Sequence, residues 1–165
     1  MQELEPPDSY NLSAAMGWLD LGNALEAANE FEKIRKEYRG HIRVLEAEWR
    51  IATANKNWEG ALAIARTQVQ AHADNPAGWI NQSYCLHETK RTQEAWDELW
   101  SVSEKFSKVG VLHYNLACYA CQLGNLEVAK KCLNLAIQCQ NKKQVKKMAL
   151  ADEDLKPLAD HIRSL

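Results

Sequence analysis

The chain has 165 residues, of which 46% are hydrophobic and 25% are charged, and its formal net charge is -2 with seven Gly and four Pro. This length allows one domain with a sizeable core, and the composition is typical of a largely helical globular protein and excludes a disordered chain. No apolar run approaches the roughly 20 residues that span a bilayer, and the start MQELEPPDSY lacks the basic and apolar regions of a signal peptide. We therefore expect a cytoplasmic protein without a membrane partner, and five unevenly spaced cysteines agree with a reducing compartment.

The two ends of the chain carry opposite charge. Residues 1–32 contain seven acidic side chains and no Lys or Arg, whereas residues 130–147 contain six lysines and no acid. We expect these groups to lie on solvated helix faces. Two ends of opposite charge could also favour head-to-tail contacts between copies, or a partner whose own charge is unevenly distributed. Six lysines alone do not predict nucleic-acid binding.

Four segments of the chain align with one another: GNALEAANEFEKI, KNWEGALAIARTQV, KRTQEAWDELWSV and GNLEVAKKCLNLAI. Their central alanines, Ala27, Ala61, Ala95 and Ala129, each lie 34 residues after the one before. An amphipathic stretch with helical spacing precedes each segment, and a turn signal separates the two. Each unit is therefore predicted to be helix, turn, helix. Gly22 and Gly124 suit the position at which a helix ends in the left-handed conformation. Asn or Lys at the equivalent position of the other repeats can adopt this conformation with some strain.

In chain order, the prediction is a tail at residues 1–7, repeats at 8–41, 42–75, 76–109 and 110–143, and a capping helix and tail at 144–165, all in one solenoid domain. Pro76 suits the first turn of the third repeat. After the fourth repeat, a helix over 144–151 would cover it with Val145, Met148, Ala149 and Leu150. Residues 152–154 break this helix, and a final short helix with Leu155, Leu158 and Ile162 is expected to fold back.

The 34-residue unit resembles the tetratricopeptide repeat (TPR), which has the form W-x2-L-G-x2-Y, then A-x3-F, then P. The resemblance covers about residues 8–143, and the second helices match best, with Ala27 before Phe31 and Ala95 before Leu99. Trp79 occupies the Trp position in the third repeat, and the terminal Pro of the family is missing throughout. The resemblance implies an all-α, right-handed superhelix of antiparallel helix pairs in which no repeat buries its apolar stripe alone.

The resemblance also implies a concave groove, lined by the first helices, that takes an extended or helical peptide of a partner protein. The peptide-binding positions carried over from the family are Met16, Arg43, Arg50, Ile80, Asn81, Tyr84, Tyr114, Asn115 and Gln122, beside Leu12, Glu46, His87, Val111 and Cys118. Asn81 and Asn115 are the strongest candidates, because groove-binding members carry an asparagine there that hydrogen-bonds the ligand backbone. The alternative is that each caps a local backbone group.

The chaperone-type members recognise a terminal carboxylate through Lys and Asn on the first helix. Leu12 and Met16 stand at those positions here, so a clamp of the Hsp70/Hsp90 type is not expected. Arg43 and Arg50, about two turns apart on one face, could still hold an acidic side chain, with Glu46 placed between them where it could neutralise one.

The cysteines at 118, 121, 132 and 139 superficially resemble a zinc spacing. In the repeat register, Cys118 and Cys121 lie one turn apart on a first helix and point inward, whereas Cys132 and Cys139 lie on a second helix and point mainly outward. The four thiols should therefore not converge, and no strand precedes the CxxC as a thioredoxin-like motif requires. We expect small packing residues, with no catalytic residue, metal or cofactor.

The sequence thus predicts a non-enzymatic interaction module that binds a protein or peptide in its concave groove. Two alternatives remain open. One is a self-associating subunit, in which the basic end or exposed tryptophans of one copy meet the acidic first repeat of another. The other is a metal or redox protein built around the cysteines.

Overall fold

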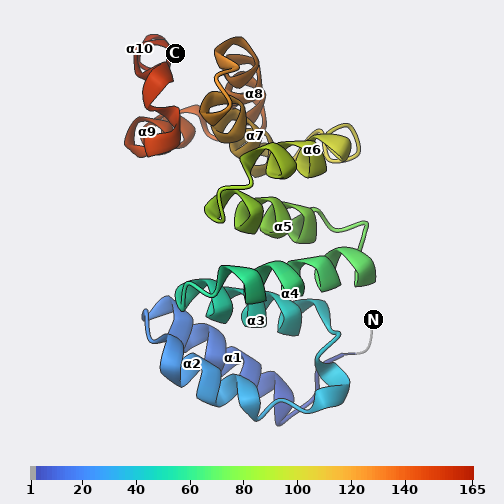
Figure 1. Cartoon of the computed structure of the whole chain (residues 1–165). Coiled ribbons are helices and arrows are strands. Elements are labelled where there is room, and N and C mark those ends of the chain that lie inside the picture. Colours follow the sequence, from blue (N-terminus) through green and yellow to red (C-terminus); the bar gives the residue numbers. More distant parts are fainter. Residues whose placement is uncertain (1–2) are drawn as a thin grey trace. The chain divides into compact units, whose positions relative to one another are not determined.

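A computed structural model describes residues 3–165, and its helices come in pairs (Figure 1). The pairs are α1 (Asp8–Asp20) with α2 (Ala24–Glu32), α3 (Ile42–Ala54) with α4 (Trp58–Ala71), α5 (Pro76–Glu88) with α6 (Thr92–Ser101), and α7 (Gly110–Gln122) with α8 (Leu126–Cys139). The 3-10 turn η1 (Lys36–Tyr38) follows the first pair, and α9 (Lys142–Ala151), the 3-10 segment η2 (Glu153–Leu158) and α10 (Ala159–Ser164) follow the last. Successive first helices begin 34 residues apart, and so do successive second helices, which confirms the predicted repeat.

The described residues contain no strand, so the all-α prediction is confirmed. The chain divides into two compact units, Met1–Gln82 (unit 1) and Ser83–Leu165 (unit 2), and the division falls within α5. Over residues 3–165, no helix combines the length and the apolar character that crossing a membrane requires.

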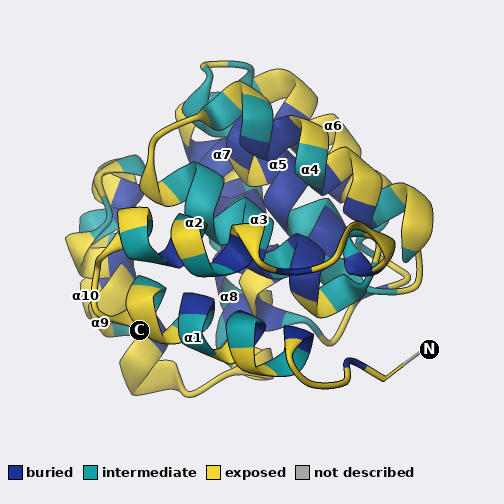
Figure 2. Cartoon of the chain, turned by 90° about the horizontal axis from the view of Figure 1, so that it is seen from below, coloured by how far each residue is buried: buried dark blue, intermediate teal, exposed yellow. Residues whose placement is uncertain are grey.

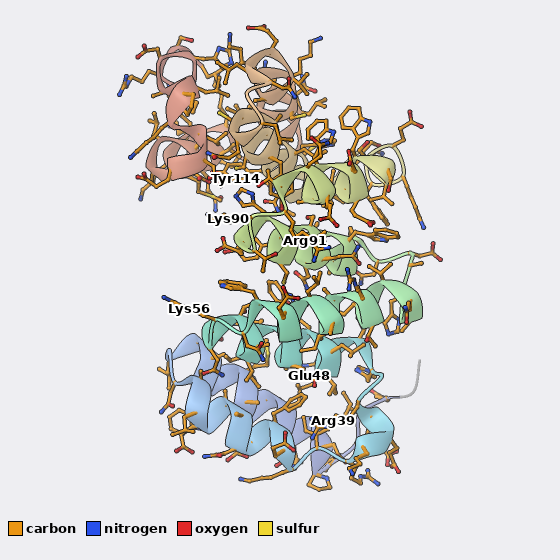
Figure 3. All side chains as sticks on the ribbon, viewed as in Figure 1. Arg39, Glu48, Lys56, Lys90, Arg91 and Tyr114 are labelled. Carbon is orange, nitrogen blue, oxygen red and sulfur yellow. The ribbon has the colours of Figure 1, made fainter. Side chains whose placement is uncertain are left out.

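Each repeat turns the chain with the same backbone device. The amide of the residue that follows the turn donates to a carbonyl five residues back, as Asn23 does to Trp18 at 2.8 Å and Asn125 does to Ala120 at 2.8 Å. The residue before it is left-handed in all four turns, at Gly22, Lys56, Lys90 and Gly124 (φ 76°, 55°, 65° and 79°). This is the Schellman ending, which satisfies the last carbonyls of the helix. Lys56 and Lys90 are labelled at their helix ends in Figure 3.

Packing explains why the alanines recur. Ala27, Ala61, Ala95 and Ala129 each have 0% exposure. Because a methyl group allows close approach, α1 packs on α2, α3 on α4 and α7 on α8, with larger side chains such as Phe31 and Leu133 filling the space around the contacts. In unit 2, α7 consists mostly of buried residues, shown in dark blue in Figure 2.

The core of unit 1 joins its first two repeats. Leu12 and Ala15 of α1, Phe31 of α2 and Val44 and Ala47 of α3 form one buried cluster with Leu4, Ile34 and Tyr38. An ion pair between a buried carboxylate and an exposed arginine closes its end: Asp8, fully buried, accepts from the Arg35 amide at 2.7 Å and from Arg35 Nε at 2.7 Å. The Arg35 amide, followed by the guanidinium, holds the pKa of Asp8 below its usual value against the opposing effect of burial.

The C-terminal segment packs on the fourth repeat. Leu155, Leu158 and Ile162 are buried, and η2 lies against α7, α8 and α9, which confirms the expected fold-back after residue 151. The expectation for the preceding helix is half right. Val145 and Ala149 of α9 are buried, whereas Met148 and Leu150 are exposed at 47% and 45%, because α9 presents only one narrow face to its neighbours.

Candidate functional site

The first helices of unit 1 enclose a pocket of about 400 Å³, which we call the unit 1 pocket. Its lining residues are Leu12, Met16, Ile42, Arg43, Glu46, Asn75 and Ala77. Four of these, Leu12, Met16, Arg43 and Glu46, are positions that the repeat register placed in the groove. The walls are mainly apolar, and Arg43 is the exposed charged group at the rim.

The charges around the unit 1 pocket pair differently from the expectation. Arg50 forms an ion pair with Asp20, with 2.7 Å between Nη2 and Oδ1. Its Nη1 also lies 3.7 Å from the Met16 sulfur. Glu46 neutralises neither arginine through an ion pair. Its Oε2 instead accepts from Asn81 Nδ2 at 3.1 Å and from Gln68 Nε2 at 3.4 Å. Within residues 3–165 the arginines in ion pairs are Arg35, Arg39, Arg50, Arg91 and Arg163, and the Arg43 guanidinium is not among them.

Asn81 lies in a buried side-chain network. It is 7% exposed, and its amide nitrogen donates both to Glu46 and, at 2.9 Å, to Gln68 Oε1. Its partners are thus side chains of α3 and α4 rather than the local backbone. Both donor hydrogens are used within the chain, so the amide nitrogen is not available to a ligand backbone in this arrangement. Ile80, its neighbour in the predicted set, is half-buried.

Unit 2 contains a second cavity, of about 240 Å³, which we call the unit 2 pocket. Its lining residues are Tyr84, His87, Glu88, Tyr114, Asn115, Cys118, Tyr119, Asp152 and Asp154. The structure therefore brings Tyr84, Tyr114 and Asn115 of the predicted set together. Gln122 lies next to them, since its Nε2 donates to the Asp154 carbonyl at 3.3 Å.

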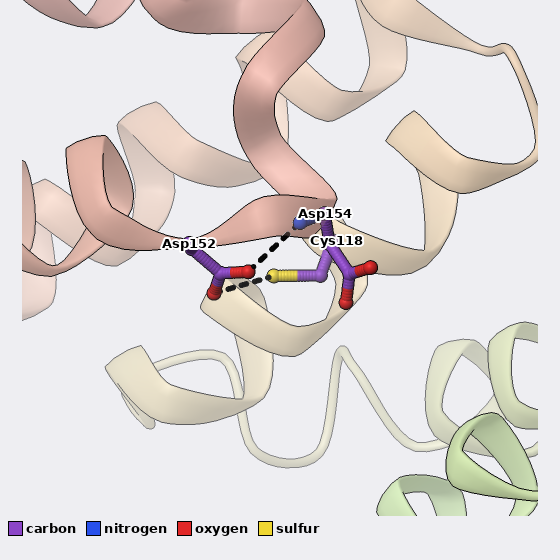
Figure 4. A group of neighbouring side chains, drawn as sticks. All are labelled: Cys118, Asp152 and Asp154. Carbon is purple, nitrogen blue, oxygen red and sulfur yellow. Dashed lines mark hydrogen bonds between the residues drawn. The ribbon is translucent and has the colours of Figure 1, made fainter.

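The C-terminal segment covers some of the predicted groove positions of α7, Tyr114 and Cys118 among them, whereas Val111 and Gln122 stay exposed. Tyr114 is only 8% exposed, and its hydroxyl donates to Asp152 Oδ2 at 2.8 Å. His87 Nε2 lies 2.8 Å from Asp154 Oδ2. Asp152 also caps the start of η2 by accepting from the Asp154 amide at 3.0 Å (Figure 4). Sequence reasoning missed both aspartates as lining residues, although Asp152 lies 34 residues after Cys118 and so occupies the next equivalent position.

Cys118 is the cysteine with the most potential ligand atoms around it. Its thiol, with one carboxylate oxygen each of Asp152 and Asp154, forms a group of such atoms within 4.8 Å of one another (Figure 4). Burial, followed by the two aspartates, raises the pKa of the Cys118 thiol far above its ordinary value. Since the thiolate is the reactive and metal-binding form, these surroundings oppose nucleophilic or redox chemistry at Cys118.

The other cysteines are spread through unit 2. Cys121 is buried, and burial raises its pKa as well. The expectation that Cys132 points mainly outward is wrong: it is 2% exposed, and burial raises its pKa to about 11. Its place in α8 falls on the side that packs on α7, like Ala129 and Ala136. Cys139 is exposed, as expected.

Paired helices at a 34-residue spacing define the class: the chain is a helical repeat protein. Solved structures place it more closely. It superposes on TTC0263, a thermophilic TPR protein of Thermus thermophilus, with a TM-score of 0.77, 16% identity and coverage of 94% of this chain and 82% of that one. It superposes on PilF of Pseudomonas aeruginosa with a TM-score of 0.76 and 18% identity, over 95% of this chain and 69% of PilF. MamA from Desulfovibrio magneticus RS-1 gives a TM-score of 0.71, 12% identity and coverage of 98% and 94%.

The chain therefore has the fold of tetratricopeptide repeat proteins, as the resemblance of its sequence indicated. No family model and no curated protein matches its sequence.

Proposed function

We propose that the protein is a non-enzymatic interaction module whose groove-lining first helices bind a peptide segment of a partner protein. The observation that carries the proposal is the unit 1 pocket, where the predicted groove positions of two repeats line one mainly apolar cavity. The fold supports the interaction role in general, because stacked helix pairs present their first helices on one side.

The unit 1 pocket suits one apolar side chain beside an acidic one. Leu12, Met16 and Ile42 offer apolar contact, and the flexible Met16 adapts to different shapes. Arg43 is the group left to bind a carboxylate, because Arg50 is held by Asp20 and Glu46 is held by amides. We therefore expect a ligand segment with an apolar residue and a nearby Asp or Glu.

A selection from a random peptide library on the full chain tests this proposal. Enriched peptides should combine an apolar residue with a nearby acid. Their affinity, measured by calorimetry, should fall about tenfold or more in Arg43→Glu, because a charge-assisted hydrogen bond contributes about 1.5–3 kcal/mol.

The matched control is Arg66→Glu, which makes the same charge change on an exposed site of α4 outside the pocket and should bind like wild type. Enriched peptides that bind Arg43→Glu as tightly as wild type would contradict the proposed role of the unit 1 pocket.

A further inference from the structure

The unit 2 pocket is strongly acidic. Glu88, Asp152 and Asp154 contribute carboxylates to its lining, and no lining residue is Lys or Arg. Asp152 accepts from the Tyr114 hydroxyl, the Cys118 thiol and the Asp154 amide. Asp154 lies against the His87 ring, whose other nitrogen lies 3.0 Å from Thr92 Oγ1. A hydroxyl orients a carboxylate without cancelling its charge, so the cavity retains an excess of negative charge.

Aromatic rings form much of the remaining wall, beside Asn115 and Cys118. Tyr84, Tyr114 and Tyr119 line the pocket, and the rings of Tyr119 and His87 have centroids 4.9 Å apart. Burial, followed by the charge of Glu88, raises the pKa of Tyr84 to about 12, so the ring carries a neutral hydroxyl at physiological pH. Rings of this kind attract cations through their faces, and the attraction grows as the cation is desolvated.

The volume matches a single side chain. Water occupies about 30 Å³ per molecule in the liquid, so a cavity of about 240 Å³ holds about eight groups of that size. A Lys side chain has four methylene groups and one ammonium, and the Arg side chain is only slightly longer. The pocket is too small for a drug-sized ligand, for which about 300 Å³ is a lower limit.

We propose that the unit 2 pocket binds the Lys or Arg side chain of a partner segment. Negative charge attracts the cationic head, and the tyrosine rings contact the apolar stem, which long basic side chains bury along apolar surfaces. The inference rests on the proposed function, since it names the ligand chemistry for the groove positions of unit 2. It gives this pocket a specificity opposite in charge to that of Arg43 in unit 1.

Titration of the isotope-labelled full chain with N-acetyl-lysine methylamide, followed by NMR, tests the inference. The amide signals of Tyr84, Tyr114 and Asn115 should shift and saturate with this probe. The norleucine analogue, which has the same stem without the charge, should leave them in place.

Variants then separate charge from folding. Glu88→Gln should raise the Kd for the lysine probe about threefold or more, the size expected for loss of one partly exposed charge pair. The double variant Asp152→Asn, Asp154→Asn should abolish saturation by the lysine probe. It preserves acceptor oxygens for Tyr114 and His87, so unchanged thermal unfolding would show that the fold is retained. Glu104→Gln, on an exposed site outside the pocket, is the matched control.

Three results would overturn the inference: no shift with the lysine probe, equal shifts with the norleucine analogue, or saturation of the same signals by zinc chloride but not by the lysine probe. The last would assign Cys118, Asp152 and Asp154 to a metal ion instead. The lysine titration should be unchanged in Arg43→Glu, so failure of this inference and failure of the unit 1 proposal are read from different variants.

Discussion

The four turn residues show how one backbone requirement is met by different amino acids. Gly22 and Gly124 adopt the left-handed conformation without a side chain, and no heavy atom lies near the position that a Cβ would take at either. Lys56 and Lys90 adopt the same conformation with a Cβ, which costs roughly 1–2 kcal/mol per residue. The chain tolerates this cost because the Schellman hydrogen bonds and the packed helices on either side hold the turn in place.

Replacement of either lysine by glycine should therefore stabilise the protein. In Lys56→Gly and Lys90→Gly, relief of the strained φ exceeds the extra chain entropy that glycine loses on folding, and we expect a gain of about 0.5–1 kcal/mol in the free energy of unfolding. Urea denaturation of the full chain measures it. Gly22→Lys is the reciprocal control and should lose a similar amount, whereas destabilised Lys→Gly variants would show that the lysine side chains make contacts that outweigh the strain.

At the scale of elements, the C-terminal segment has two roles. Its apolar side chains Leu155, Leu158 and Ile162 cover the last repeat, which would otherwise expose the apolar faces of α7 and α8. Its polar side chains Asp152 and Asp154 line the unit 2 pocket. Since both sets lie within one short stretch, the packing of the cap determines the position of the carboxylates in the pocket.

Leu155→Ala should thus weaken both stability and the pocket. Leu155 is 0% exposed, and truncation of such a residue costs about 2–5 kcal/mol through lost burial and the cavity left behind. We expect that loss in urea denaturation, together with a weaker affinity for the lysine probe. Leu150→Ala removes the same atoms from a site that is 45% exposed, and it should stay within about 0.5 kcal/mol of wild type. Equal losses in the two variants would show that the cap does not pack as the structure indicates.

At the scale of the molecule, the charge of the chain is distributed unevenly. The seven acidic residues of 1–32 belong to unit 1, and the six lysines of 130–147 belong to unit 2. Glu32, Lys143 and Lys147 are exposed and Glu26 is half-buried, which agrees with solvated helix faces, whereas Asp8 is fully buried. The proposed interaction module needs no contact between copies, whereas head-to-tail association would bring these opposite charges together.

Sedimentation equilibrium should accordingly give the mass of a single chain at both low and high salt. Screening changes greatly between about 0.01 M and about 1 M salt, where the Debye length falls from about 30 Å to about 3 Å. A mass that rises at low salt and returns to that of one chain at high salt would support head-to-tail association between the acidic and basic ends.

Most of the fold could be predicted from the sequence, whereas the site could be predicted only in part. The period, the helix pairs and the buried alanines follow from local spacing, because each repeat meets the same packing problem with the same residue types. The register also brought Met16, Arg43, Tyr114 and Asn115 to the linings of two pockets. It did not reveal that Asn81 is engaged by Glu46 and Gln68, since those contacts depend on side-chain positions in three different helices.

The sequence by itself determined the helical repeat and its turns, because these depend on a periodic pattern that local interactions enforce. Only the tertiary structure decided which polar groups are already paired. Arg50 with Asp20, and Tyr114 with Asp152, join residues at least 30 apart in the chain, and no spacing rule specifies such pairs. That pairing leaves Arg43 available in one pocket and an excess of carboxylates in the other, which is the physical basis of both proposals.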